Sequence, residues 1–269
     1  MLKITKLLSA SLIIILVSNI FGDETFDNLL KAGKYKEAID YADQNIPPVS
    51  RDAALWVKIA QANEKAGYIE KALASYMVSW RMNPKDYASL FGAARIYNKV
   101  KQYENAMNMA KKALELKFSG EASWEYAKAC IALKKPGEAK RALEKVIETD
   151  PKNNVANREL GIIYYEDGQY SQAVPLLKKA YDQKADAKVS LQLGKSYLKT
   201  GDKRSAIAYL KKATEMNPSL HEAHLDLARA YYEINQYKDA ASSYSRVDGK
   251  IFFNTNDYYY FAKSLYSTD

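Results

Sequence analysis

The amino-acid sequence predicts an all-α protein made of one short unit repeated along the chain, and three observations support this prediction. Alanines recur at intervals of 33 or 34 residues, as Ala38, Ala72, Ala106, Ala139, Ala173, Ala206 and Ala240. Around each of them, apolar residues are spaced three or four positions apart, as on one face of a helix. Glycines and prolines recur at fixed distances from the same alanines. A period of this length is typical of helical repeats that stack into a solenoid.

The first 22 residues differ in composition from the rest and are predicted to be a signal peptide. Lys3 and Lys6 precede an apolar stretch over residues 7–17, and Gly22 stands just before the first acidic residues. This order is typical of a secretory signal peptide. The apolar stretch is shorter than the ~20 residues that a membrane-spanning helix needs. We therefore expect cleavage near Gly22 and export to a periplasmic or cell-envelope location, with a short uncleaved anchor as the alternative.

Residues 23–269 are predicted to form about seven helix–turn–helix repeats and a final single helix. A glycine five residues before the alanine marks the turn, because glycine readily adopts the left-handed conformation of a helix end; these are Gly33, Gly67, Gly168 and Gly201. A proline twelve residues after the alanine ends the second helix; these are Pro84, Pro151 and Pro218. Small residues are expected to let the first helix approach the second: Ala60, Ala94, Ala127, Gly161, Gly194, Ala228 and Ala262.

Several repeats depart from this pattern. Phe26 occupies the small position of the first repeat, and Pro47 with Pro48 is expected to end its second helix early. Pro175 falls in the first turns of a second helix and is expected to bend it slightly. After Ala262 the sequence stops where a second helix would begin. The last helix is therefore expected to act as a lone cap, to await a partner, or to belong to a longer native chain.

The sequence between Gly161 and Pro218 resembles the tetratricopeptide repeat family, because its small, Tyr, Gly, Ala and terminal Pro residues stand at the family's spacing. The resemblance extends over essentially residues 23–269 and weakens toward both ends. It implies a right-handed superhelical α-solenoid of stacked antiparallel helix pairs. In that family the first helices of the repeats line the concave side of the superhelix.

Signals of catalysis are nearly absent, so we expect a protein that is not an enzyme and that binds no cofactor or metal. The sequence contains no phosphate-binding glycine loop, no nucleophile elbow and no zinc-spaced cysteine cluster. His221 and His224 lie three residues apart and could share a metal, but no third ligand stands near them in the sequence. Cys130 is the only cysteine, which excludes an internal disulfide.

The first helices carry the predicted binding site. The residue that follows each small position is Gln61, Arg95, Lys128, Ile162, Lys195, Arg229 or Lys263, so five of these seven residues are basic. Residues four before and three after them lie on the same helical stripe and are often aromatic or apolar. We predict that the concave groove is formed by Phe91, Arg95, Asn98, Trp124, Lys128, Arg158, Tyr165, Lys195, Arg229, Tyr232, Tyr259 and Lys263.

Such a stripe predicts an extended peptide or partner protein that carries acidic residues and apolar anchors. The alternative is that the cations are ordinary solvated positions and the aromatic residues pack against neighbours. One subtype of the family binds the C-termini of chaperones through a particular set of residues, the carboxylate clamp. The residues at the equivalent positions of this sequence differ from that set, which disfavours chaperone tails as ligands. No nucleic acid is expected, because the basic residues occur once per repeat among acidic ones.

We therefore expect an exported scaffold that binds proteins, acting as an assembly factor or complex subunit of a bacterial envelope. Two alternatives stay open: a non-catalytic substrate-binding or regulatory arm of a larger enzyme, and a glycan- or peptidoglycan-binding protein whose tyrosines stack on sugars. Membrane contact is expected only through an uncleaved N-terminal segment. The incompletely covered last helix is a further expected contact site.

Overall fold

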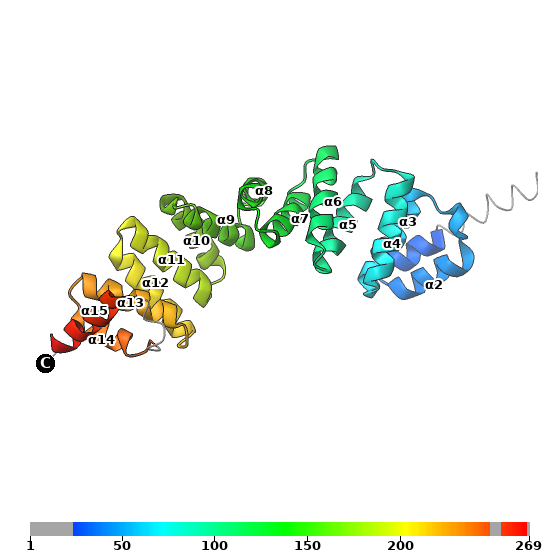
Figure 1. Ribbon diagram of the computed structural model, residues 1–269. Helices are drawn as coiled ribbons and strands as arrows, with labels where there is room; N and C mark the ends of the chain where they lie inside the picture. Colours follow the sequence, from blue (N-terminus) through cyan, green and yellow to red (C-terminus); the bar gives the residue numbers. More distant parts are fainter. Residues whose placement is uncertain (1–23, 248–253, 268–269) are drawn as a thin grey trace, which may run out of the picture. The chain divides into compact units, whose positions relative to one another are not determined.

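A computed structural model describes residues 24–247 and 254–267 (Figure 1). Within these ranges all regular secondary structure is helical, so the fold of the described residues is all-α. The predicted fold class is therefore confirmed, while the predicted signal segment lies outside the described residues. The chain divides into two compact units, residues 1–135 and 136–269. Each unit consists of helices that follow one another through short turns and stack on their neighbours.

The first described segment of unit 1 is helical and covers residues 24–31. The helices that follow are α2 (Tyr35–Asn45), the short 3-10 helix η1 (Pro48–Ser50), α3 (Ala53–Ala66), α4 (Ile69–Met82), α5 (Tyr87–Lys99), α6 (Tyr103–Leu116) and α7 (Gly120–Ala132). As the two prolines predict, α2 is shorter than α4 and α6 and ends before Pro47.

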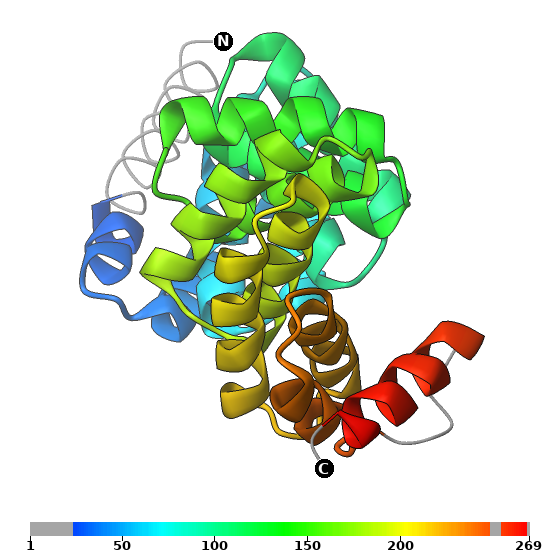
Figure 2. The same cartoon turned by 90° about the vertical axis from the view of Figure 1, so that its left-hand side faces the viewer.

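Unit 2 begins at Pro136, which is the first residue of its first helix, where a proline has no helical hydrogen bond to lose. Its helices are α8 (Pro136–Thr149), α9 (Asn154–Glu166), α10 (Tyr170–Gln183), α11 (Ala187–Thr200), α12 (Lys203–Met216), α13 (His221–Glu233), α14 (Tyr237–Tyr244) and α15 (Thr255–Tyr266). Pro175 lies inside α10. Figure 2 shows α15, in red, beside the orange end of this unit, and α15 contacts α13 and α14.

The turn between the two helices of a repeat needs one residue with positive φ. The four predicted glycines adopt it, with φ of 72°, 86°, 74° and 85°. In the other repeats the same place is taken by Lys101, Lys134 and Asn235, at φ of 62°, 55° and 62°. A side chain in this conformation costs about 1–2 kcal/mol relative to glycine, so two lysines are held in the turn by the helices around them.

The recurring alanines have the packing role that their period predicts. All seven are fully buried, each in the second helix of its repeat. Two small residues of the first helices lie close to leucines of the second helices: a Cβ added to Gly161 would lie 2.7 Å from Cγ of Leu177, and one added to Gly194 would lie 2.7 Å from Cγ of Leu210. Ala262 is the exception, because it is exposed on α15 and no second helix follows it within the described residues.

The first helices also begin with a feature that the sequence interpretation did not identify. Most of them start behind a polar residue whose side-chain oxygen accepts a hydrogen bond from the backbone N–H three residues later, which satisfies an otherwise unpaired donor. These residues are Asp52, Asp86, Ser119, Asn153, Asp186 and Asn254. Leu220 occupies the same place before α13 and makes no such bond. It instead packs against the apolar core of unit 2.

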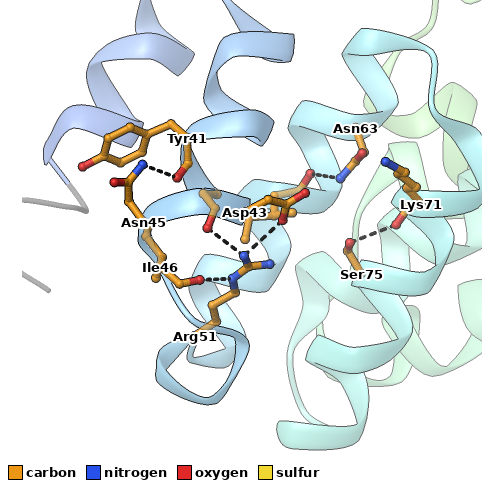
Figure 3. A network of polar contacts seen from close by, with 10 residues as sticks. Tyr41, Asp43, Asn45, Ile46, Arg51, Asn63, Lys71 and Ser75 are labelled. Atoms are coloured by element: carbon orange, nitrogen blue, oxygen red, sulfur yellow. Dashed lines mark hydrogen bonds and ion pairs between the residues drawn. The ribbon is translucent and has the colours of Figure 1, made fainter.

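A buried arginine, Arg51, binds the C-terminal end of α2 in unit 1 (Figure 3). Arg51 is 5% exposed, and it donates from Nε to the Ile46 carbonyl at 2.9 Å and from Nη2 to the Ala42 carbonyl at 2.7 Å. Nη2 also contacts the Asp43 carboxylate at 3.1 Å. Its guanidinium lies 4.9 Å from the centre of the Trp56 ring. The cation thus occupies the C-terminal end of α2, where the helix dipole favours positive charge.

Candidate functional site

In each unit the first helices of successive repeats contact one another and form a continuous face. In unit 2 this face consists of α9, α11, α13 and α15, and in unit 1 of α3, α5 and α7. We call each the first-helix face of its unit. The stripe of predicted binding residues lies on these helices, because the residue after each small position points away from the second helix of its own repeat.

A cavity with a volume of about 440 Å³ opens on the first-helix face of unit 2. Three successive first helices contribute to it: Tyr165 comes from α9, Lys195 from α11 and Arg229 from α13, and all three were predicted from the sequence. The rest of the lining is Leu198, Lys199, Glu222, Leu225, Asp226, Ala230 and Glu233. Leu198 and Leu225 lie on the predicted stripe, three residues after Lys195 and four before Arg229, whereas the other five were not predicted. This volume is within the ~300–1,000 Å³ typical of ligand pockets.

Two of the three cations of the cavity are bound by carboxylates of neighbouring helices. Arg229 makes a two-pronged contact with Asp257 of α15, at 2.7 Å from Nε to Oδ1 and 2.6 Å from Nη2 to Oδ2. Asp257 is fully buried, so this pair anchors α15 to α13. Lys195 of α11 forms an ion pair with Glu222 of α13. Each pair therefore joins one repeat to the next.

Asp226 is the exception among the charged groups of the cavity. Its Oδ1 lies 3.6 Å from Nη1 of Arg229, which is longer than a hydrogen bond, and its buried Oδ2 has no hydrogen-bond partner among the described residues. The residue is only 9% exposed. Burial raises the pKa of the Asp226 carboxyl above its ordinary value, although Lys195 and Arg229 oppose this.

The tyrosine of the cavity is held by a second ring. Tyr165 is half-buried and packs on Tyr170, with ring centroids 5.4 Å apart. Burial raises the pKa of its hydroxyl, so Tyr165 is neutral at physiological pH and acts as an apolar surface with a hydrogen-bonding tip.

The first-helix face of unit 1 brings together the five predicted residues of that unit in two clusters. Arg95 binds Glu64 of the preceding repeat, and its guanidinium lies 5.3 Å from the centre of the Phe91 ring. Asn98 donates to the Glu125 backbone carbonyl and carboxylate, both at 2.8 Å. The second cluster contains Lys128, which binds Glu125 and lies 5.7 Å from the centre of the Trp124 ring.

The remaining predicted residues lie outside the cavity of unit 2. Arg158 binds its neighbour Glu159, at 2.7 Å from Nη2 to Oε1. Tyr232 of α13 stacks on Tyr260 of α15 at 4.3 Å between ring centroids. Lys263 lies over Tyr232 at 5.7 Å and over Tyr259 at 6.0 Å. These rings form a tyrosine cluster between the last two first helices.

The predicted basic stripe is therefore balanced by charge within the chain. Five cations of the predicted groove have a carboxylate partner, often on the adjacent repeat: Arg95, Lys128, Arg158, Lys195 and Arg229. Such pairs neutralise the field that was expected to attract an acidic partner, and this weakens the reason for expecting one.

The carboxylates that the prediction missed lie on the same side of α13 as the predicted stripe. Asp226 lies four residues after Glu222 and three before Arg229, so all three face the same side of α13. The prediction was based on the cations of the stripe and therefore did not include these carboxylates. Glu222 is exposed, and nothing in the sequence indicates that Asp226, one turn further along the same side of α13, is almost wholly buried.

The two histidines lie on the other side of α13 from the first-helix face. His224 contacts the Pro218 carbonyl through Nε2 at 3.1 Å, and His221 contacts the Arg246 carbonyl through Nδ1 at 3.1 Å. His224 lines a smaller cavity, of about 230 Å³, between α12, α13 and α14. Each ring thus has a backbone partner that fixes its orientation.

Comparisons with known proteins agree with this architecture. Models of the tetratricopeptide repeat match residues 87–119, 126–188 and 191–251, which together make up more than half of the chain. The chain therefore belongs to the tetratricopeptide repeat family. Among curated proteins it is similar to DnaJ homolog subfamily C member 3 of Gallus gallus, at 23% identity over 189 residues. That match covers 64% of this chain and only 38% of the relative.

Two solved structures show the same fold. YrrB, a TPR protein with an unusual peptide-binding site, has a TM-score of 0.59 at 20% identity, over 70% of this chain and 95% of YrrB. A tetratricopeptide repeat protein from Parabacteroides merdae ATCC 43184 has a TM-score of 0.55 at 16% identity, over 92% of this chain and 99% of that protein. At these identities the likeness concerns the fold alone.

Among the described residues, no helix combines the length and the apolar character that crossing a membrane requires.

Proposed function

We propose that this protein is a binding scaffold that holds a segment of another protein on the first-helix face of unit 2. The observation that carries the proposal is the cavity of about 440 Å³ lined by side chains from α9, α11 and α13. A site built from three successive repeats can follow an extended chain, since stacked repeats present continuous elongated surfaces.

The lining suits a protein segment because it combines apolar and polar groups. Leu198, Leu225 and Ala230 offer apolar contact, and Tyr165 adds an aromatic ring with a polar tip. Tyrosine and arginine are the residue types that most often anchor protein interfaces. A side chain of the partner that enters the cavity is shielded from water, whereas the rest of the segment lies along the exposed face.

A display library of random linear peptides tests this proposal with the full chain as the target. Selected peptides should bind the wild-type chain and lose most of their affinity for Tyr165→Ala, because that change removes a wall of the cavity. The matched control is Tyr181→Ala on α10, a half-buried tyrosine that packs against Tyr209 and lies outside the cavity lining. Equal loss in both variants, or selection of no peptide, contradicts the proposal.

We further propose export to a bacterial envelope, where the protein would act as an assembly factor or complex subunit. The support is the signal-like composition of residues 1–22 alone. Fusing these residues to a reporter that is active only outside the cytoplasm tests it. An inactive reporter, together with a chain of unprocessed mass in the cytoplasmic fraction, contradicts export.

A glycan ligand is a second candidate, favoured by the tyrosine cluster of α13 and α15. Tyr259 is 58% exposed beside the stacked Tyr232 and Tyr260 rings, so its face is open to a sugar ring. A glycan array probed with the wild-type chain and with Tyr259→Ala distinguishes the candidates. Binding to glycans that depends on Tyr259 favours this function over the peptide scaffold.

A further inference from the structure

Most charges that line the cavity of unit 2 are paired, which leaves one buried carboxylate and one exposed lysine. Lys195 is bound by Glu222 and Arg229 by Asp257. Glu233 contacts Lys203 at 3.0 Å. Among the lining residues this leaves Asp226, almost wholly buried, and Lys199, which is exposed.

The Asp226 carboxylate lacks the hydrogen bonds that a buried charge needs. Its nearest cation, Arg229, contacts Oδ1 only at 3.6 Å and directs its short bonds to Asp257. Oδ2 is buried without a partner among the described residues. Such a group costs free energy in the unbound protein, and the cost is recovered when a donor reaches it.

The Oδ2 atom of Asp226, which has no hydrogen-bond partner among the described residues, favours a cationic donor over a neutral or anionic ligand. The other charges do not decide the sign of the ligand, because three cations and three carboxylates line the cavity and the outside partners Asp257 and Lys203 add one charge of each sign. Hydrogen bonds between a cation and a carboxylate are roughly twice as strong as those between neutral groups. An anion entering the cavity would be repelled by Asp226, whereas Lys195 and Arg229 are already bound by carboxylates and Lys199 is exposed to solvent.

The shape of the lining suits a long basic side chain. Lysine and arginine bury an apolar stem while keeping a charged head. Leu198, Leu225 and Ala230 can contact the stem, and the half-buried Tyr165 ring can stack on a guanidinium or ammonium group. Asp226 then receives the head.

We propose that the cavity of unit 2 selects protein segments that carry a lysine or arginine, whose side chain enters the cavity and donates to Asp226. This inference rests on the proposed peptide-binding function and names the residue type that the cavity recognises. It replaces the acidic partner expected from the sequence with a basic anchor.

A positional scanning peptide array tests the inference with the full chain. At one position of the bound peptides, the wild-type chain should prefer lysine and arginine over norleucine, glutamine and glutamate. Asp226→Asn keeps the size of the side chain and removes its charge, and it should weaken the binding of basic peptides roughly ten- to a hundredfold. Binding of the norleucine peptide should change little.

Two controls separate recognition from folding. Asp182→Asn on α10 removes a carboxylate outside the cavity, one that pairs with Lys178, and should leave the preference unchanged. The unfolding midpoint of Asp226→Asn should equal or exceed that of the wild type, so weaker binding cannot be attributed to lost structure.

The outcomes of the array distinguish this inference from the function on which it rests. Peptides that bind through Tyr165 without any preference for lysine or arginine keep the proposed function and overturn the inference. An unchanged preference in Asp226→Asn also overturns it. If no peptide binds the wild-type chain, both fail together.

Discussion

Replacing glycine by alanine at two helical positions of unit 2 should change stability in opposite directions. A Cβ on Gly194 would lie 2.7 Å from Cγ of Leu210, 2.9 Å from its Cδ2 and 3.3 Å from the Ala206 carbonyl oxygen. Leu210 is fully buried, so it has no open space to move into. Overpacking of this kind costs about 1–3 kcal/mol.

The higher helix propensity of alanine offsets about 1 kcal/mol of that cost. We therefore expect Gly194→Ala to lower the free energy of unfolding by up to about 2 kcal/mol. Gly137 of α8 is the matched control, because nothing lies within 4 Å of a Cβ built there. Gly137→Ala should gain only the propensity term, which is at most about 1 kcal/mol because Gly137 is the second residue of α8.

Guanidinium unfolding followed by far-ultraviolet circular dichroism measures both changes. A double-mutant cycle with Leu210→Ala then isolates the contact, because in that background the added methyl no longer meets a leucine. Gly194→Ala should become neutral or stabilising there. The reasoning is refuted if Gly194→Ala stabilises the otherwise wild-type chain, or if it destabilises the Leu210→Ala chain as much as the wild type.

Four further predictions address the turns, the caps and the buried charges. Lys134→Gly should raise the free energy of unfolding by about 1 kcal/mol, because glycine adopts φ of 55° without strain, and a lower unfolding midpoint would count against this. Asp186→Ala should lose about 1 kcal/mol with the N-cap bond to Val189, measurable as a lower unfolding midpoint. Arg51→Met should lower the free energy of unfolding by about 3 kcal/mol, because the carbonyls of Ala42 and Ile46 at the end of α2 lose a charged donor. Native-state hydrogen exchange should then show α2 opening more readily. Asp226→Asn should stabilise the chain at neutral pH and lose this advantage in acid. The pKa of Asp226 is raised in the folded state, so the wild type loses stability as the pH rises above the ordinary aspartate range. A stability advantage of Asp226→Asn that is independent of pH would refute the assignment.

The repeat and its turns could be predicted from the sequence because each depends on neighbours close along the chain. The buried alanines and the positive φ of Gly33, Gly67, Gly168 and Gly201 follow from helical periodicity and from the conformational freedom of glycine. The lysine at position 101 takes the same backbone conformation without any local preference for it. There the packing of the two helices imposes the turn on the residue.

The candidate site could be predicted only in part. The period places Tyr165, Lys195 and Arg229 on one face, and the structure brings them to one cavity. Their charge partners come from other repeats: Glu222 lies 27 residues beyond Lys195, and Asp257 lies 28 beyond Arg229. A stripe of cations in the sequence is consequently a set of ion pairs in the fold.

The sequence by itself determined the unit, its length, the face on which the first helices place their side chains, and the family. These properties follow from spacing along one helix, where each residue's direction is set by the 3.6-residue turn. Only the tertiary structure decided which charges of the unit 2 cavity form ion pairs and which carboxylate lacks a close partner among the described residues. Pairing and burial depend on helices from adjacent repeats, and these helices leave Asp226 of α13 buried in the cavity, with no hydrogen-bond partner for its Oδ2 among the described residues.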